Sequence, residues 1–403
     1  MAIIVQKYGG SSLADTQYIK QVARRVVDTV DQGHQVVVVV SAMGKTTDQL
    51  KAMASQVAKN PARRELDMLL SSGERIAMSL MSLAISDLGH EAVSLTGSQS
   101  GIITNDSHAN ARIIDVRPVR VQDELEKGRV VIVAGYQGMS YKREITTLGR
   151  GGSDTTAVAL AAALGAEVCE ILSDVDGVYT ADPRCVPDPL RLEELSYDEA
   201  LALTETGAKV LNPEAVAYAA RHHVRIFAAA TFGDRDVGTY ILRRDEPVPF
   251  GRPRAVSHRR QIYRLRFSGP ADLGRQVMVL LHRHGLPLYT LEMAAQQDGR
   301  LLLKGYIPPE DAAEWPGFCE AVEPLAAHLD LDTDQGAVTL VGEGITEGLA
   351  VVTQLYDLLE QEGFSPCDLK AGAHKITAIL PTKRVEEAAR LLHNRFIRDK
   401  KYD

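Results

Sequence analysis

The sequence predicts an α/β protein in which a mainly parallel sheet, flanked by helices, is followed by two smaller modules. Through the first half of the 403 residues, strand-like apolar runs alternate with helical patterns, and five loops after strands carry Gly, Ser, Thr or Asp. In the last third, a strand–helix–strand–strand–helix pattern occurs twice. The chain is longer than one typical domain, so we expect two or three domains.

The first elements are a strand, a glycine loop and a helix. Val5 lies in a short buried strand, Lys7–Ser12 contains two glycines, and apolar residues at helical spacing follow. The β-branched run Val36–Val40 is typical of a strand covered on both faces, and it leads into a second glycine-bearing loop, Ser41–Thr47. Ligands bind at the carboxyl ends of strands in such sheets, so these loops are candidate ligand contacts.

The same alternation continues beyond these loops. A helical pattern covers Arg64–Leu88, and Glu74 lies near its start. Strand-like runs and a further helix are predicted at Ala92–Leu95, Val130–Ala134, Thr155–Leu164 and Glu167–Leu172. The predicted chemistry is therefore at one edge of the sheet.

The composition of the chain changes near Arg243–Arg260, where three prolines lie among six arginines. This composition indicates a linker. The predicted domains are residues 1–245, a linker at 246–262, and modules at 263–333 and 334–403. Each module has ferredoxin-like proportions, and we expect the two to share a sheet.

The composition of the chain limits the classes of partner molecule that we expect. The formal net charge of −8 argues against a nucleic-acid platform, so a small-molecule partner is expected. We expect no membrane segment, because no run approaches about 18 apolar residues and the amino terminus lacks a signal-peptide pattern. The four cysteines are too widely spaced for a metal site or a disulfide framework, which favours a reduced, cytoplasmic protein.

The segment Thr146–Asp154 carries the strongest chemical signal. Its three glycines and small hydroxyl residues precede a predicted helix, whose first turn offers unpaired N–H groups to an anion. Arg150 suits a carboxylate or phosphate, whereas Asp154 suits a cationic or metal-bearing group. A capped turn is the simpler alternative for Ser153 and Asp154.

Together, the loops contain what phosphoryl transfer needs. Lys7 and the neighbouring glycine amides can surround transferring oxygens, acids can hold Mg²⁺ or an amino group, and Arg150 can bind an anionic acceptor. Singly, Lys7 could be a surface lysine, Glu74 a helix charge and Asp174 a turn residue. A Rossmann oxidoreductase is a different alternative, weakly suggested by Gly149–Gly152.

With these residues in view, the chain resembles the aspartate kinases of the amino-acid-kinase family, which have a carbamate-kinase-like fold. Over residues 2–232 the resemblance rests on closely spaced sequence motifs. In the remainder of the chain it rests on the order of the predicted strands and helices. The motifs that carry it are Lys7–Ser12, Val40–Gly44, Thr147–Thr155, Ser173–Arg184 and Gly207–Leu211.

The resemblance implies roles for individual residues. Lys7, Arg150, Asp154 and Asp174 would carry the catalysis. The residues expected around the acceptor L-aspartate are Ser41, Thr47, Glu74, Arg150, Ser153 and Asp154. The residues expected around ATP are Lys7, Gly9, Gly10, Ser173, Asp174, Tyr179, Asp182, Arg184 and Lys209. Mg²⁺ would bridge the phosphates, and its protein ligands stay undefined.

The implied product is 4-phospho-L-aspartate, in the first step toward lysine, threonine and methionine. A kinase of the same fold acting on another amino dicarboxylate is an alternative, and so is a catalytically dead regulatory homologue.

The two modules resemble ACT domains, which in this family join subunits and bind lysine or threonine. Here the segments Ser268–Gly274, Gly342–Gly348 and Leu369–Ile376 depart from the family's effector-binding pattern. We therefore expect a homo-oligomer with weak or absent inhibition by lysine and threonine.

Overall fold

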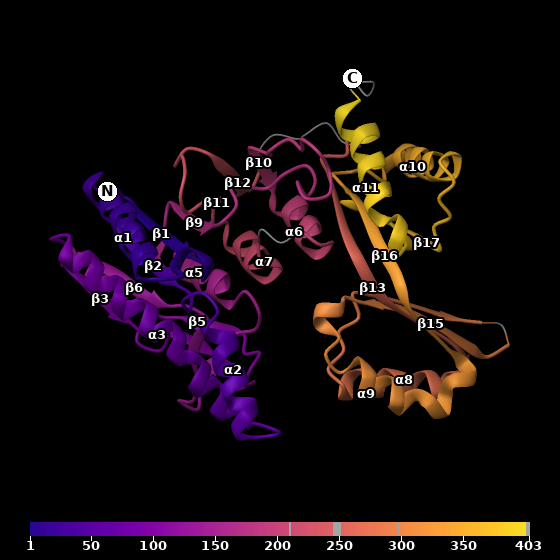
Figure 1. Ribbon diagram of the computed structural model, residues 1–403, viewed down its shortest axis with the longest axis horizontal. Helices are drawn as coiled ribbons and strands as arrows, with labels where there is room; N and C mark the ends of the chain where they lie inside the picture. The colour runs from indigo at the N-terminus through magenta and orange to yellow at the C-terminus, as the bar shows by residue number, and fades with distance from the viewer. Residues whose placement is uncertain (209–210, 245–250, 297, 400–403) are drawn as a thin grey trace. The chain divides into compact units, whose positions relative to one another are not determined.

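The computed structural model describes residues 1–208, 211–244, 251–296 and 298–399. The chain forms two compact units (Figure 1). The first consists of Met1–Tyr179 and Leu190–Pro247, and the second of Thr180–Pro189 and Val248–Asp403. The segment 180–189 therefore belongs to the second unit, although the predicted first domain included it.

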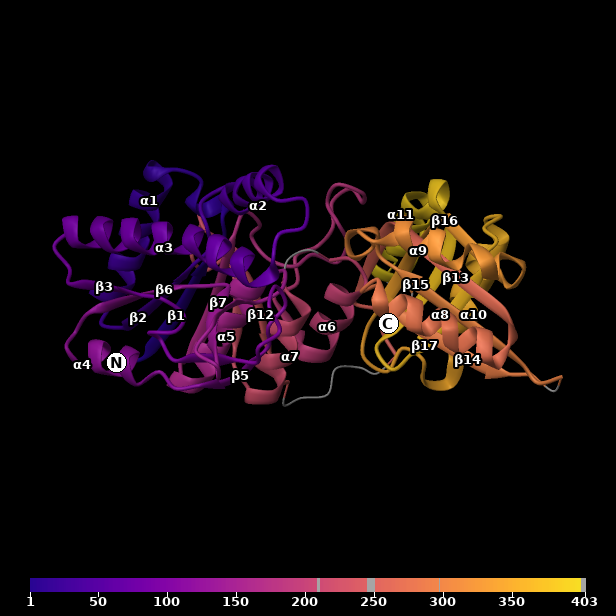
Figure 2. The same ribbon diagram turned by 90° about the horizontal axis from the view of Figure 1, so that it is seen from below.

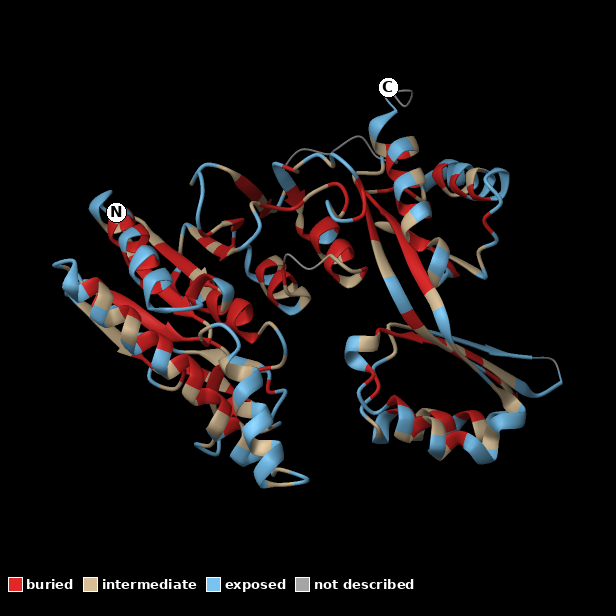
Figure 3. Cartoon of the chain, viewed as in Figure 1, coloured by how far each residue is buried: buried red, intermediate tan, exposed pale blue. Residues whose placement is uncertain are grey.

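The first unit is built on an eight-stranded sheet with the order β10-β12-β11-β9-β1-β2-β6-β3. Its pairs are parallel except β11 with β12, which confirms the predicted mainly parallel sheet. The strands are β1 (Ile3–Tyr8), β2 (Gln35–Val40), β3 (Ala92–Leu95), β6 (Val130–Ala134), β9 (Val168–Ser173), β10 (Glu194–Ser196), β11 (Ile226–Ala230) and β12 (Gly238–Leu242). Buried residues fill the central strands (Figure 3), as their β-branched sequences predict.

A second, four-stranded sheet with the order β5-β4-β7-β8 was not expected from the sequence. Its strands are β4 (Ile102–Thr104), β5 (Ile113–Val116), β7 (Gln137–Ser140) and β8 (Ile145–Thr147). They have three or four residues each, too few for the alternation of side chains to stand out in the sequence. β8 leads directly into the glycine-rich segment that ends at Asp154.

Helices cover both faces of the parallel sheet (Figure 2). α1 and α3 pack on one face, in a core with alternate residues of β2 and β6, and α5 packs against β1, β2 and β9. The helices are α1 (Thr16–Asp31), α2 (Thr46–Val57), α3 (Arg63–Asp87), α4 (Val119–Glu126), α5 (Gly152–Leu164), α6 (Tyr197–Glu205) and α7 (Pro213–His222). The side chain of Asp15 caps α1 by accepting from the amides of Gln17 and Tyr18.

Among the described helices, α3 alone is long and apolar enough to cross a membrane by length and composition. However, 44% of its most apolar window is buried inside the fold. Ala77, Met81 and Ile85 of α3 lie in the hydrophobic core beneath the sheet. α3 is therefore a core helix of the first unit.

The second unit contains one six-stranded antiparallel sheet with the order β14-β15-β13-β16-β18-β17. Its strands are β13 (Ala255–Pro270), β14 (Thr290–Ala295), β15 (Arg300–Ile307), β16 (Leu329–Val341), β17 (Asp368–Gly372) and β18 (Lys375–Pro381). Its helices are α8 (Ala271–Arg283), α9 (Trp315–Val322), α10 (Ala350–Gln361) and α11 (Val385–His393). The twofold strand–helix–strand–strand–helix pattern and the shared sheet are thus present.

The long strands β13 and β16 join two cores. Leu265 and Phe267 of β13 pack with α8 and α9, whereas Val256 of the same strand packs with α10 and α11. Residues 255–262, predicted as linker, are therefore the first half of a strand. The prolines and arginines around this segment hid its pairing with β16, which only a distant part of the chain supplies. Residues 246–250 of the predicted linker fall outside the described residues.

Candidate active site

The loops at the carboxyl ends of four adjacent strands, β9, β1, β2 and β6, form the candidate site. Ser41 directly follows β2, and its amide donates to the carbonyl of Tyr8 at the end of β1. Thr47 lies in the first turn of α2 and Ser173 is the last residue of β9. The parallel order brings these predicted residues to one edge of the sheet.

Lys7 and Asp154 form an ion pair at this edge. Lys7 Nζ lies 2.7 Å from Asp154 Oδ1, and only 11% and 12% of the two side chains is exposed. Lys7 lies near the end of β1, and Asp154 lies in the first turn of α5. The structure thus holds an ammonium group in a fixed place beside two glycines and a helix amino terminus.

Two glycines allow the loops to approach closely. A Cβ atom at Gly10 would lie 2.8 Å from the carbonyl oxygen of Ala42, so only glycine lets the loop after β1 touch the loop after β2. Gly151 has a φ of +76°, and a Cβ atom there would lie 2.1 Å from Asn212 Nδ2. The glycine-rich segments therefore serve the packing of the site as well as its access to a ligand.

Glu74 is buried in the middle of α3, rather than in its first turns as the sequence suggested. Its Oε1 accepts from the amide of Ala42 at 3.1 Å, and its Oε2 is buried without a hydrogen-bond partner among the described residues. Burial raises the pKa of the carboxyl group to about 7. Because an unpaired buried carboxylate is costly, Oε2 is suited to a cationic ligand.

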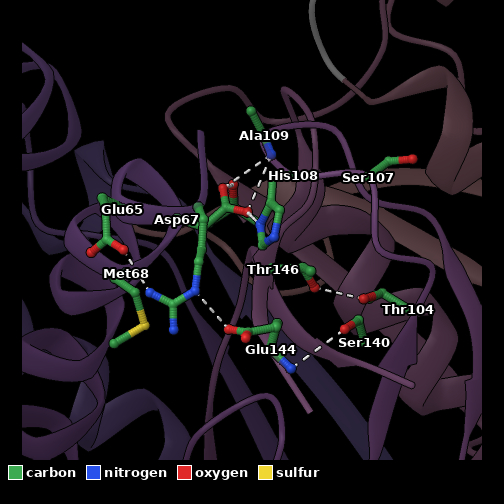
Figure 4. Close-up of polar contacts among 12 residues, drawn as sticks. Glu65, Asp67, Met68, Thr104, Ser107, His108, Ala109, Ser140, Glu144 and Thr146 are labelled. Carbon is green, nitrogen blue, oxygen red and sulfur yellow. Dashed lines mark hydrogen bonds and ion pairs between the residues drawn. The ribbon is translucent and has the colours of Figure 1, made fainter. Parts of the chain in front are cut away.

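Asp67 is a buried residue of the site region that the sequence reasoning missed. Its carboxylate accepts from the amide of Ala109 at 3.1 and 3.2 Å, and Nδ1 of His108 lies 2.6 Å from Oδ2 (Figure 4). The hydroxyl of Thr147, at the end of β8, donates to Oδ1. Asp67 therefore ties α3 to the strand that leads into Leu148–Asp154. A signal was available, because Asp67 lies two helical turns before Glu74 on the same face of the predicted helix.

Arg150 lies in the turn before α5, and Ser153 lies in the first turn of α5. The side chain of Arg150 is exposed and has no ion-pair partner among the described residues, while its carbonyl oxygen accepts from Asn212 at 2.7 Å. Ser153 is buried, and a Cβ atom at Gly135 would lie 2.7 Å from its hydroxyl oxygen. Arg150 is thus free to bind an anion, whereas Ser153 packs against the loop after β6.

The remaining residues expected around the nucleotide belong to both units. Asp174 is exposed after β9, and the hydroxyl of Tyr179 donates to Asp176 at 2.9 Å. Asp182 and Arg184 lie in the second unit, where they form an ion pair of 2.8 Å that lowers the pKa of Asp182. Lys209 lies outside the described residues.

The described part of the chain contains no group of three or more His, Cys, Asp or Glu side chains that could hold a metal ion. Mg²⁺ commonly takes one or two carboxylates and completes its shell with substrate phosphates and water. Asp174, an exposed carboxylate at the carboxyl end of β9, fits that requirement.

Comparison with known proteins agrees with this geometry. The model of the amino acid kinase family matches residues 2–228. The aspartokinase of Mycobacterium tuberculosis is 40% identical over 409 residues, covering 98% of this chain and 96% of that protein. The aspartokinase of Geobacillus stearothermophilus is 38% identical, with 98% and 97% covered.

Solved structures share the fold over the whole length. E. coli aspartokinase III in complex with aspartate and ADP matches with a TM-score of 0.81 and 23% identity, covering 97% of this chain and 99% of that chain. Aspartate kinase from Synechocystis is 30% identical with a TM-score of 0.56, covering 98% and 69%.

The chain belongs to the amino acid kinase family. Its relatives of matching length place it, within that family, among the aspartate kinases, as the motifs predicted.

Proposed function

We propose that the protein transfers the γ-phosphoryl group of ATP to the side-chain carboxylate of L-aspartate, giving 4-phospho-L-aspartate and ADP. This would be the first step toward lysine, threonine and methionine. The observation that carries the proposal is the buried Lys7–Asp154 ion pair at the edge where the glycine loops meet. The aspartokinase relatives at about 40% identity support the choice of aspartate.

The reaction requires charge neutralisation more than proton transfer. A carboxylate with an ordinary pKa near 3.9 is already ionised at neutral pH, so the attacking oxygen needs no general base. The new bond joins that oxygen to the γ-phosphorus atom, and the bond from phosphorus to the bridging oxygen of ADP breaks. Lys7 and the amide of Gly10 would stabilise the phosphoryl oxygens, and Asp154 would hold the Lys7 ammonium in place. The amide of Gly9, also expected there, donates to the carbonyl of Leu172 at 3.3 Å.

The acceptor would be bound through its charged groups. The guanidinium of Arg150 suits the α-carboxylate, because its fork geometry matches two carboxylate oxygens. Glu74, with its unpartnered Oε2, suits the ammonium group. Asp154 is paired with Lys7, so we assign the ammonium to Glu74 rather than to Asp154. Ser41, Thr47 and Ser153 would complete the acceptor side.

ATP would lie over Gly9, Gly10, Ser173 and Asp174. Tyr179 would contact it from the loop that follows Ser173 and Asp174. Mg²⁺ would supply positive charge at the phosphates, and Asp174 is the residue proposed to hold it. Asp182, Arg184 and Lys209 remain predictions from the family motif.

A hydroxamate assay with ATP, Mg²⁺ and a panel of amino acids tests the proposal. Product that depends on aspartate would support it. Product that depends on another amino dicarboxylate would favour the rival acceptor, and absence of product with every acceptor would indicate a catalytically dead homologue.

The raised pKa of Glu74 predicts a pH dependence. Below a pH of about 7 the carboxyl group is protonated and cannot pair with an ammonium ion, so kcat/KM for aspartate should rise between about pH 6 and about pH 8 and then level off. Initial rates at low aspartate concentration across this range measure the effect.

The variant Glu74→Gln provides the control for this pH dependence. It keeps the shape of the side chain but removes its ionisation, so the rise attributed to Glu74 should disappear and KM for aspartate should increase about tenfold. An unchanged pH profile in the variant would assign the rise to another group.

The second unit has the two-module sheet of tandem ACT domains, and we propose that it forms the contact of a homo-oligomer. We also propose that the enzyme acts in the cytoplasm. Three segments that depart from the family's effector-binding pattern lie in this unit, at Ser268–Gly274, Gly342–Gly348 and Leu369–Ile376.

We therefore expect lysine and threonine to inhibit the enzyme weakly or not at all. Lysine or threonine at about 1 mM, singly or together, should change the rate less than twofold, because those segments lack the family's pattern of residues that would hydrogen-bond an amino-acid effector. Steady-state rates with and without each amino acid measure this. Strong inhibition at sub-millimolar concentration would contradict it.

A further inference from the structure

A cavity of about 340 Å³ lies within the first unit, on the α1 face of the parallel sheet. It is lined by Ile4 and Gln6 of β1, Glu170 of β9, Phe227 of β11 and Arg25 of α1, among others. Ile4, Glu170 and Phe227 lie in the amino-terminal halves of their strands, whereas the candidate active site lies at the carboxyl ends. Since side chains alternate along β1, Gln6 and Lys7 point to opposite faces of the sheet. The cavity is therefore separate from the candidate active site.

Hydrogen bonds fix the polar wall of the cavity. Nε2 of the buried Gln6 donates to Glu170 Oε2 at 2.9 Å and to Thr29 Oγ1 at 3.1 Å. Nη1 of Arg25, a residue that is only 8% exposed, donates to the carbonyl oxygens of Ala230 and Thr231 at 3.1 and 2.8 Å. Both charged side chains are thus held in place before any ligand arrives.

Several polar atoms of this wall keep unused hydrogen-bonding capacity. Nη2 of Arg25 and Oε1 of Glu170 have no partner among the residues that the structure describes, and Nδ1 of His34 is buried without one. Of these atoms, His34 Nδ1 is the buried one, and a buried polar group without a partner costs free energy. The unused atoms of Arg25 and Glu170 are therefore the ones that water or a ligand can reach.

The lining carries two arginines, Arg25 and Arg235, and two carboxylates, Glu170 and Asp236, so it suits a ligand with both an anionic group and a hydrogen-bond donor. Burial raises the pKa of Glu170, although the charges of Arg25 and Arg235 oppose this shift. Arg235 also pairs with Asp28 at the surface. On the other side, the rings of Phe227 and Tyr240 lie 4.6 Å apart and offer an apolar surface.

We propose that this cavity binds a small amino acid or hydroxy acid, with its carboxylate at Arg25 and Arg235 and its amino or hydroxyl group at Glu170. The aromatic rings of Phe227 and Tyr240 would contact its carbon chain. The volume is within the range of small-molecule sites, and a few fixed polar groups beside an aromatic surface are typical of them.

Isothermal titration calorimetry on the full chain tests this site. The titrations are run on protein saturated with a non-hydrolysable ATP analogue, with and without aspartate, so that binding at the acceptor site and occupation of the cavity by aspartate itself are both recognised. The probes are the other protein amino acids, L-malate and succinate. We expect at least one amino acid or malate to bind. The proposal is overturned if no probe binds at about 10 mM, or if succinate, which lacks the second donor, binds as tightly as malate. Because heat of binding is measured, the outcome does not depend on the catalytic activity.

Matched variants locate the binding. Glu170→Gln removes the charge that faces the ligand's donor and should weaken binding about tenfold or more. Glu167→Gln, the same change at an exposed position just before β9, should leave binding unchanged. Unchanged binding in Glu170→Gln would place the ligand elsewhere and overturn the assignment. If Glu170→Gln does not fold, Arg235→Met at the partly exposed rim serves instead, with loss of carboxylate binding as the expected result.

Discussion

Replacing Lys7 by methionine is expected to lower kcat about 1,000-fold while changing KM for aspartate little. The ammonium group would act on the phosphoryl oxygens in the transition state, and no other described lysine or arginine is ion-paired to Asp154. The arginine proposed to bind the acceptor, Arg150, is untouched by the change. Steady-state kinetics with varied aspartate at saturating ATP measure the two constants separately.

The variant also leaves Asp154 buried without its partner, which alone can cost about 3–5 kcal/mol of stability. The double variant Lys7→Met with Asp154→Asn removes that uncompensated charge and should fold more stably than the single variant, yet stay inactive. Lys20→Met, at an exposed position of α1, is the matched control and should behave as the wild type. Near-normal turnover by a folded Lys7→Met protein would refute the role.

Replacing Asp67 by alanine is expected to lower the free energy of unfolding by about 3 kcal/mol. The carboxylate is fully buried and accepts from His108, the amide of Ala109 and the hydroxyl of Thr147. Without it, these donors lose their partner inside the fold. Urea unfolding followed by circular dichroism measures the difference.

The same variant should reduce kcat/KM for aspartate about tenfold, because Thr147 begins the segment that presents Arg150 and Asp154. Asp87→Ala, at the exposed end of the same helix, is the control and should change neither quantity. A variant with normal stability and normal kcat/KM would show that Asp67 has no such positioning role.

Many elements of the first unit could be predicted from local sequence patterns. Val36–Val40 is apolar at every position because its strand is covered on both faces, and the glycine loops follow strands because ligands and neighbouring loops approach there. The order of the motifs was sufficient to identify the family. The short strands β4, β5, β7 and β8 were missed, since three or four residues carry too little periodicity.

The pairings within the candidate site depended on tertiary structure. The sequence predicted a cationic or metal-bearing group beside Asp154, and β1 and α5 bring the ammonium of Lys7 there, at 2.7 Å. Glu74 was expected near the start of its helix, among the residues around the acceptor. The packing of α3 under the sheet buries it and raises its pKa to about 7.

In the second unit, too, some features were predictable from the sequence and others depended on the tertiary structure. Its repeated strand and helix pattern was predictable, but the extension of β13 through residues 255–262 and the membership of 180–189 depend on partners far away in the chain. By itself, therefore, the sequence determined the element order, the glycine-rich loops and the family, because these depend on local residue types and their spacing. Only the tertiary structure decided which charges are paired, which are buried and which stay free for a ligand, because desolvation and ion pairing depend on neighbours that the chain brings together from distant positions.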